Sequence, residues 1–307
     1  GGVPRIQSSL EYPPDAGRDG ESDDACHAVS QAVLTMFETE TIRALLRGVA
    51  RDRLEALDVL ADIDSTNTCL LDAEPPKPLQ FRVALTDHQT AGRGRQGRRW
   101  LSRPGSSICL SIAYTFNGRP PELPAATLPV GVAVVRALED AGIPGARLKW
   151  PNDIVIQNGK LGGILTEVHT GARDKTSIVV GIGLNVDVGD ATLLDPAETG
   201  IGAVRDIASV VSGALPDANV IVAALIKRVL DSLVRFEADG LEPFIEAWQR
   251  LDWLRGQRVT IEAGPRRIDG VCEGIDVDGA LILSDGKSRQ RILSGSVHPI
   301  GPTGGPT

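Results

Sequence analysis

The residues with the clearest chemical potential form a run of alternating glycine and arginine, Gly92-Arg93-Gly94-Arg95-Gln96-Gly97-Arg98-Arg99-Trp100. Glycine lets a backbone come close to a ligand because it lacks a Cβ atom, and arginine offers a planar fork of donors that fits phosphate or carboxylate oxygens. The run is neither a P-loop nor a dinucleotide-binding turn, since Arg98 stands where the third glycine of G-x-G-x-x-G would be. It therefore predicts an anion-binding loop of another kind, with phosphate chemistry as the first hypothesis.

A noncatalytic RNA-binding module that uses this Gly/Arg run through charge alone is one alternative interpretation. Segments typical of strands, 81–85 and 107–114, flank the run, so it is predicted to be a loop inside a folded unit. The rest of the chain adds no second basic cluster, and the net charge is -8 with a pI near 5.1. These observations disfavour general nucleic-acid binding.

Length and composition narrow the class of protein further. The 307 residues are 42% hydrophobic, which is enough for a substantial core and more than one structural unit. No apolar stretch approaches the roughly 20 residues that span a bilayer, and no signal core is seen at the N-terminus, so a cytoplasmic protein without membrane contact is expected. The cysteines lie far apart without a C-x-x-C pair, so no zinc site is predicted.

The N-terminal region predicts little ordered structure before the core. Residues 1–24 are polar and rich in Gly and Pro, which predicts a disordered tail. Apolar residues at roughly helical spacing predict a short helical lead-in over 25–60, whose second part runs through Leu54, Leu57 and Leu60. This ordered length is too short for a winged helix-turn-helix, so DNA binding is not expected.

The central unit is predicted to span 61–252. A strand ending near Ile63 is followed by Asp64-Ser65-Thr66-Asn67, which is typical of a helix N-cap. A long helix is expected over 123–141. A hairpin of 153–156 and 161–168 should turn at Asn158-Gly159 and carry Lys160 at its rim.

The second half of that unit contains a buried strand over 178–186, where Gly181 and Gly183 indicate the close approach of a backbone or a ligand. Helices are expected over 218–236 and 241–251. From 253 to 301, short alternating segments separated by turns predict a small β-barrel, followed by a tail at 302–307.

Four segments in this order resemble the biotin protein ligase family: Asp64-Ser65-Thr66-Asn67, the loop 89–100, Lys149-Trp150-Pro151-Asn152-Asp153, and Lys160-Leu161-Gly162-Gly163-Ile164-Leu165 followed by Glu167. The closing Ser296-Val297-His298-Pro299-Ile300 is also similar, so the resemblance covers about residues 58 to 300. It implies an α+β fold, a mixed β-sheet flanked by helices with a small C-terminal SH3-like β-barrel. It also implies the monofunctional type that lacks the DNA-binding domain.

The resemblance implies a two-step reaction with ATP and biotin as substrates and Mg2+ as cofactor. Biotin carboxylate attacks the α-phosphate to give biotinyl-5′-AMP, and a lysine of a biotin carboxyl carrier protein or domain of a biotin-dependent carboxylase then takes the biotin. Such chemistry needs cations aimed at phosphate and carboxylate oxygens in a pocket shielded from water. A homodimer is left open.

The resemblance also assigns site residues. Lys160 and Arg95 are the expected catalytic residues. The expected biotin-binding residues are Ser65, Thr66, Asn67, Gln89, Gly92, Arg93, Arg95, Lys160 and Gly163. The expected ATP-binding residues are Arg93, Arg95, Arg98, Trp100, Lys149, Asn152 and Asn185. Asp153, with Asn152, is expected to hold the magnesium ion.

Ordinary structural roles compete with several of these assignments. Ser65 and its neighbours can simply cap a helix, Pro-Asn-Asp is common turn chemistry, and Trp100 can anchor the end of the loop in the core. Lys160 could be a solvated residue beside a turn. The following Gly162-Gly163 favours the catalytic interpretation, because two small residues would make room for a flat ligand against the strand.

Two features leave the assignment incomplete. No tryptophan follows Asn185 between residues 187 and 199, where some family members close an aromatic ring over the adenine. A lipoate or octanoyl protein ligase shares the general fold and a pocket lysine, and its acyl chain would need a long apolar tunnel. The polar Ser65, Thr66 and Gln89 favour biotin.

Overall fold

The computed structural model describes residues 35–120, 122–170, 176–189 and 203–300. The tails predicted at 1–24 and 302–307 lie outside these ranges, and so does most of the segment in which a family tryptophan was sought.

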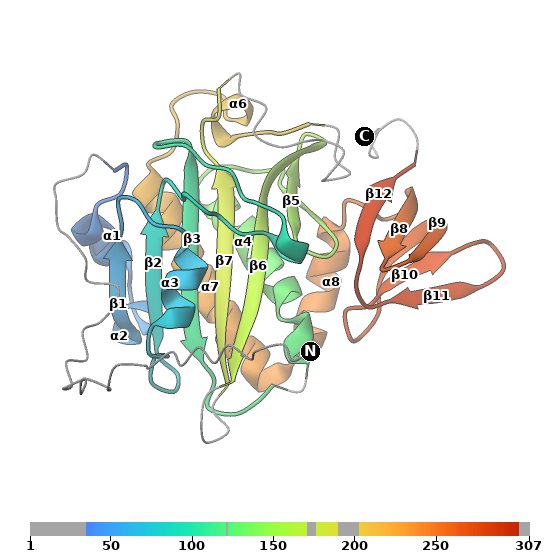
Figure 1. The fold of residues 1–307 in the computed structure, drawn as a ribbon, viewed down its shortest axis with the longest axis horizontal. Helices are drawn as coiled ribbons and strands as arrows, with labels where there is room; N and C mark the ends of the chain where they lie inside the picture. Colours follow the sequence, from blue (N-terminus) through green and yellow to red (C-terminus); the bar gives the residue numbers. More distant parts are fainter. Residues whose placement is uncertain (1–34, 121, 171–175, 190–202, 301–307) are drawn as a thin grey trace, which may run out of the picture.

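The centre of the molecule is a seven-stranded mixed sheet in the order β1-β2-β3-β7-β6-β5-β4 (Figure 1). Its strands are β1 Leu54–Val59, β2 Phe81–Thr86, β3 Ser107–Thr115, β4 Arg147–Lys149, β5 Asp153–Ile156, β6 Gly159–Thr170 and β7 Thr176–Asn185. β1 runs parallel to β2, and the other neighbours pair antiparallel. β3 is buried at every position, as expected for an apolar strand covered on both faces.

The helix predicted through Leu54, Leu57 and Leu60 is wrong, because this segment forms strand β1. A spacing of three over so short a segment does not separate helix from strand, and pairing with β2 decides the outcome. The strand predicted to end near Ile63 ends at Val59, and Ile63 makes only an isolated bridge with Gln89. The sheet thus begins at Leu54, while the domain divisions at 61 and 253 stay predictions.

Helices cover the two faces of the sheet unequally. α4 Thr127–Asp140, α7 Ala218–Asp239 and α8 Glu242–Leu251 pack on one face, and α3 Thr66–Asp72 packs on the other, over β2, β3 and β7 (Figure 1). The short helices α1 Thr39–Leu45, α2 Val49–Asp52 and α6 Ile207–Val210 complete the unit. Residues 123–125 form a 3-10 turn, so the long predicted helix starts later than expected.

The predicted hairpin is confirmed, but its turn differs by one residue. Gln157 and Asn158 have φ of 46° and 58°, so they are the two left-handed residues of the turn. Gly159 instead begins β6. A Cβ atom there would lie 2.4 Å from the side chain of Arg205, so the close packing of that side chain requires glycine.

The C-terminal unit is a five-stranded antiparallel sheet in the order β11-β10-β9-β8-β12, which confirms the predicted small SH3-like barrel (Figure 1). Its strands are β8 Arg258–Ala263, β9 Arg266–Ile275, β10 Leu281–Ser284, β11 Arg289–Ile292 and β12 Ser296–Pro299. The joint to the main sheet is made by Trp253 N–H, which donates to Leu148 O at 2.8 Å. The indole of Trp150 also donates to Gly279 O at 3.1 Å, so this tryptophan packs between the two units.

Within the described ranges, none of the helices combines the length and apolar character that crossing a bilayer requires.

Candidate active site

One cavity brings most of the predicted site residues together. It lies among the start of α3, the Gly/Arg loop, the β4–β5 turn, the glycine-rich parts of β6 and β7, and the start of β12. The empty space there is about 990 Å³ when the adjoining open solvent is included. The predicted residues that line it are Ser65, Thr66, Asn67, Gln89, Arg93, Arg95, Arg98, Trp100, Lys149, Asn152, Asp153, Lys160 and Gly163. Gly92 and Asn185 are not among its lining residues.

The chemical centre of the cavity is a carboxylate held between two ammonium groups. Asp153 Oδ1 lies 2.7 Å from Lys160 Nζ, and Asp153 Oδ2 lies 3.1 Å from Lys149 Nζ. Burial alone would raise the pKa of Asp153, but the two lysines lower it to about 2, so the carboxyl is ionised at neutral pH. Burial lowers the pKa of Lys149, and the charge of Asp153 opposes that shift.

The hairpin fixes the position of Lys160 through its backbone as well as its side chain. Lys160 N–H donates to Ala203 O, and Lys160 O accepts from Arg205 N–H, each at 2.9 Å. Asn185 Nδ2 donates to Arg205 O at 3.0 Å and approaches Lys160 O at 3.4 Å. Asn185 therefore helps to hold the backbone of Lys160 in place, and its predicted role in ATP binding stays a prediction.

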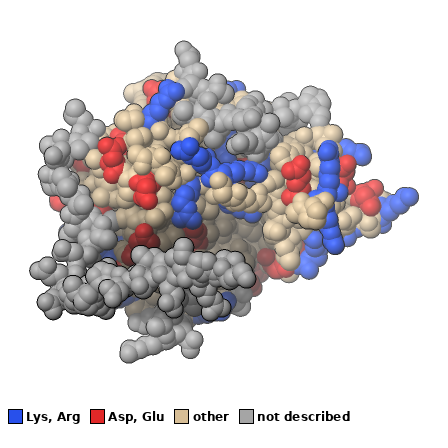
Figure 2. Space-filling view, viewed as in Figure 1, with Lys and Arg blue, Asp and Glu red and all other residues tan. Residues whose placement is uncertain are grey.

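The Gly/Arg loop is fastened to three separate parts of the structure. Arg93 Nη2 lies 2.6 Å from Glu167 Oε1 on β6. Arg95 Nη1 donates to Asn152 Oδ1 at 3.3 Å, and Arg98 Nη2 donates to Ser296 Oγ of the barrel at 2.7 Å. Burial lowers the pKa of Arg95, and the nearby charge of Asp153 opposes that effect. Figure 2 shows Lys and Arg side chains gathered between the main sheet and the barrel on this face.

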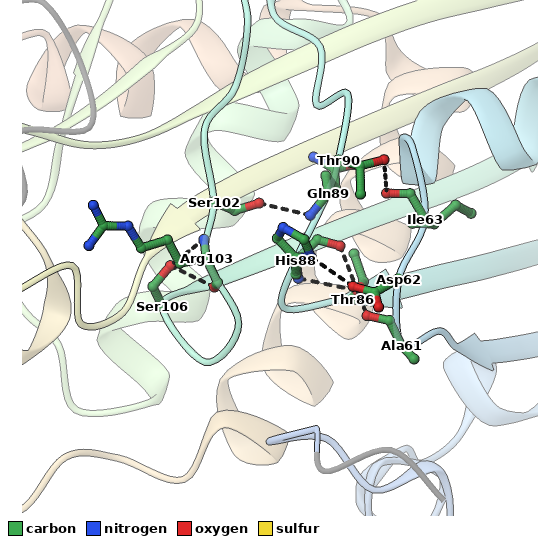
Figure 3. Close-up of polar contacts among 10 residues, drawn as sticks. All are labelled: Ala61, Asp62, Ile63, Thr86, His88, Gln89, Thr90, Ser102, Arg103 and Ser106. Atoms are coloured by element: carbon green, nitrogen blue, oxygen red, sulfur yellow. Dashed lines mark hydrogen bonds and ion pairs between the residues drawn. The ribbon is translucent and has the colours of Figure 1, made fainter. Parts of the chain in front are cut away.

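Figure 3 shows the hydrogen bonds around the base of the loop. Gln89 N–H donates to Ser102 Oγ at 2.9 Å, which joins the start of the loop to its end. His88 Nδ1 lies 2.7 Å from Asp62 Oδ1. His88 thus has a structural partner in Asp62.

The polar patch beside the lysines has the structural role weighed for it, and its contact with biotin stays a prediction. Ser65 is the N-cap of α3, and its side chain accepts from Thr68 N–H. Gln89 Oε1 accepts from Thr66 N–H at 2.8 Å. Gly92 closes the loop over this patch, because a Cβ atom there would lie 2.4 Å from Trp100 O and 2.9 Å from Gln89 Nε2.

Glycines in the strands make room for side chains of the cavity wall. A Cβ atom at Gly181 would lie 2.3 Å from Asn67 Oδ1, and one at Gly183 would lie 2.7 Å from the Trp100 ring. A close approach at these two strand positions is confirmed, but side chains make it where a backbone or a ligand was predicted. The groups that approach are Asn67 and Trp100 of the chain itself.

The pair Gly162-Gly163 divides between two purposes. Gly163 lines the cavity beside Lys160, where a Cβ atom would be 3.8 Å from Nζ. Gly162 faces the neighbouring strand, and a Cβ atom there would lie 2.3 Å from Gly183 O. The expectation that both glycines make room for a ligand is therefore wrong for Gly162, whose small size serves strand packing.

The barrel supplies a wall of the cavity that the sequence did not indicate. Gly295, Ser296 and Val297 line it, and Ser296 Oγ is bonded to Arg98. The resemblance had pointed to this segment as a family feature but gave it no role. A hydrogen bond between residues 198 positions apart leaves no local signal in the sequence.

The residues expected to hold Mg2+ do not form a dedicated metal site. Both oxygens of Asp153 are engaged by ammonium groups, and Asn152 bonds Arg95 and, through Nδ2, Ile164 O at 2.8 Å. In the part of the chain that is described, no cluster of three or more His, Cys, Asp or Glu could bind a metal ion. A resident ion bound by Asp153 does not fit this arrangement.

The arginine-rich loop, the two lysines that share Asp153 and the polar pocket together suit a ligase that forms an acyl adenylate. Residues 59–185 match the Biotin/lipoate A/B protein ligase family, and residues 255–298 match the Biotin protein ligase C terminal domain. The chain is 33% identical over 225 residues to the Bifunctional ligase/repressor BirA of Escherichia coli, a match covering 73% of this chain and 68% of that protein. It is 32% identical over 248 residues to the Biotin--[acetyl-CoA-carboxylase] ligase of Mycobacterium tuberculosis, with 78% and 88% covered.

Solved structures agree with these matches. The biotin protein ligase from Aquifex aeolicus in complex with biotin and ATP superposes with a TM-score of 0.64 and 26% identity, and the match covers 80% of this chain and 99% of that one. The chain belongs to the biotin protein ligase family.

Proposed function

We propose that this protein is an ATP-dependent biotin protein ligase. It joins biotin to ATP as biotinyl-5′-AMP and then transfers biotin to a lysine of a carboxyl carrier domain. The observation that carries the proposal is the pair of Lys149 and Lys160 on one carboxylate, with Arg95 bonded to the adjacent Asn152. These groups share a cavity with the polar patch of Ser65, Thr66 and Gln89. The first group suits phosphate and carboxylate oxygens, and the second suits a ureido ring.

In the first step, a carboxylate oxygen of biotin forms a bond to the α-phosphorus and the bond to the β-phosphate oxygen breaks, which releases pyrophosphate. Negative charge gathers on the equatorial oxygens of the α-phosphate in the transition state. Lys160 and Arg95 stabilise that charge, and they do so without reorganising because Asp153 and Asn152 already hold them in place. Lys149 and Arg98 serve the remaining phosphates.

In the second step, the neutral amine of the carrier lysine attacks the acyl carbon. The acyl carbon–oxygen bond breaks, AMP leaves, and the amine loses a proton. The loop that carries Arg93 to Arg98 keeps water from the activated acyl group by covering the cavity, which limits its hydrolysis. Magnesium enters with the phosphates of ATP as part of the substrate. A cytoplasmic location and a carrier domain as partner complete the proposal.

Pyrophosphate exchange into ATP tests this function directly. Exchange should depend on biotin, and labelled biotin should then appear on an apo carrier domain. Exchange driven by lipoate or octanoate in place of biotin would contradict the proposal and support the lipoate ligase alternative. A noncatalytic RNA module would show salt-sensitive RNA binding without any exchange.

A further inference from the structure

We propose that Ser111, a residue of β3 that does not line the cavity, fixes the direction of the hydrogen bonds in the biotin pocket and so makes the pocket select a ureido ligand. This inference rests on the proposed function. Ser111 is completely buried, with 0% of its surface exposed. Its Oγ lies 2.7 Å from Thr66 Oγ1 and 2.6 Å from Asn67 Oδ1, so one hydroxyl touches two expected biotin-binding residues.

The orientation of the Asn67 amide follows from its other contacts. Asn67 Nδ2 lies 2.8 Å from Glu167 Oε2 and 3.3 Å from Leu165 O. A backbone carbonyl and a carboxylate paired with Arg93 only accept hydrogen bonds, so the NH2 group of Asn67 must face them. The carbonyl oxygen of Asn67 then faces Ser111 and can only accept.

A serine hydroxyl has a single proton, and Ser111 donates it in the hydrogen bond to Asn67 Oδ1. The 2.7 Å contact between Ser111 and Thr66 would then bring two lone pairs together unless the Thr66 hydroxyl supplies the proton. Thr66 must therefore donate to Ser111. The Thr66 hydroxyl then has no proton to donate to Gln89 Oε1, which lies farther away at 3.2 Å from Thr66 Oγ1.

Thr66 consequently presents only lone pairs to the cavity and acts there as an acceptor. Gln89 acts in the opposite way. Its Oε1 is engaged by Thr66 N–H at 2.8 Å, so the Nε2 group remains to serve a ligand as a donor. A cyclic urea, with N–H groups beside a carbonyl oxygen, complements such an acceptor and donor, whereas the dithiolane ring of lipoate offers neither group.

The test compares Ser111→Ala with a matched control in pyrophosphate exchange. Ser177→Ala removes another buried hydroxyl, bonded to Thr115 at 2.8 Å on the adjacent strand and outside the cavity lining. Both variants should lose similar thermal stability. Ser111→Ala should raise the KM for biotin about tenfold, as expected for losing an ordering hydrogen bond, while the KM for ATP stays within about twofold. Ser177→Ala should change neither KM.

A KM for biotin that stays within about twofold of wild type in Ser111→Ala would overturn the inference, and so would equal rises in both KM values. If wild-type protein shows no biotin-dependent exchange, the proposed function itself fails.

If Ser111→Ala does not fold, a second experiment on the wild-type protein tests the inference. Two cyclic carbamate analogues of biotin, each with a ring oxygen in place of one ureido N–H, are compared as competitive inhibitors. At least one analogue should bind about tenfold more weakly than biotin. If both analogues bind as tightly as biotin, Thr66 does not act as a hydrogen-bond acceptor for the ureido ring.

Discussion

Two buried aspartates, one in the cavity and one at the joint between the sheet and the barrel, respond to burial in opposite ways. Asp153 is 7% exposed and lies between two ammonium groups, which hold its pKa near 2 against the effect of burial. Asp252 is 0% exposed, and burial raises the pKa of its carboxyl to about 7. Its Oδ1 accepts from Leu254 N–H at 2.9 Å, while Arg147 donates to its backbone carbonyl at 2.8 Å.

The difference between the two sites lies in what surrounds each carboxyl. At the joint, none of the described residues forms an ion pair with the carboxylate of Asp252, unlike the two lysines that pair with Asp153. The neutral form of Asp252 therefore persists to a pH well above the ordinary pKa of an aspartate. In the cavity, Asp153 is the counter-ion that allows two lysines to stay together under the protein surface. The cavity thus keeps its carboxylate and ammonium groups charged, whereas burial at the joint favours a neutral carboxyl.

The largest expected effect comes from removing one of the cations. Lys160→Ala should lower the rate of biotinyl-5′-AMP formation by about 10² to 10³-fold, because an ordered charge at the transition state is lost. Single-turnover formation of the adenylate measures this rate. Lys227→Ala, which removes an exposed lysine paired with Asp231, is the control and should change nothing. A loss of less than about tenfold for Lys160→Ala would argue against a catalytic lysine.

Neutralising the counter-ion should destabilise the protein. Asp153→Asn leaves Lys149 and Lys160 without a shared anion, at an expected cost of about 3 kcal/mol in the free energy of unfolding at pH 7. The folded pKa of Asp153 is lowered, so its stabilisation is present above pH 3.8 and is lost as the pH falls toward 2. Urea unfolding at several pH values should show the gap between wild type and variant closing at acid pH. A gap independent of pH would mean that charge is not its cause.

The corresponding change at the joint should have the opposite sign. Because the folded pKa of Asp252 is raised, its favourable contribution is complete below pH 3.8 and is lost as the pH rises through about 7. Asp252→Asn should therefore gain stability relative to wild type by about 2–3 kcal/mol between pH 5 and pH 8. Thermal unfolding at the two pH values measures this gain. A variant that is equally destabilised at both would show that the carboxyl is not titrating in the folded protein.

The smallest effect is expected where the barrel meets the loop. Ser296→Ala removes the oxygen that accepts from Arg98 at 2.7 Å, and the KM for ATP should rise about threefold with little change in the KM for biotin. Ser288→Ala, whose hydroxyl bonds Asp285 within a barrel turn, is the matched control. Steady-state pyrophosphate exchange gives both constants. An unchanged KM for ATP would mean that the bond from Ser296 of the barrel does not position Arg98 for ATP binding.

Much of the fold could be predicted from local sequence patterns. Apolar periodicity and turn residues indicate strands β2, β3 and β7 and helices α4, α7 and α8. The failure at Leu54–Val59 has a physical origin. A parallel edge strand is held by its partner β2, and its own residues carry no alternating pattern strong enough to reveal it.

The site shows the same division between local and distant causes. Lys149, Lys160 and the Gly/Arg loop were found because their spacing is local. The pairing of Asp153 with both lysines was not, since a carboxylate after Pro-Asn resembles a metal ligand as much as a counter-ion. Ser111 lies inside a strand that is buried at every position, and only the folded sheet brings its hydroxyl next to Thr66 and Asn67.

The position of β12 sets an order of events during synthesis. This strand is the last one of the described chain, and Gly295 to Val297 supply the wall of the cavity that Arg98 reaches. A ribosome-bound fragment that has released the main sheet but not the barrel would lack this wall, and its loop would be held only through Arg93 and Arg95. The enclosure of a bound adenylate would thus be complete only after the barrel strands have emerged and folded.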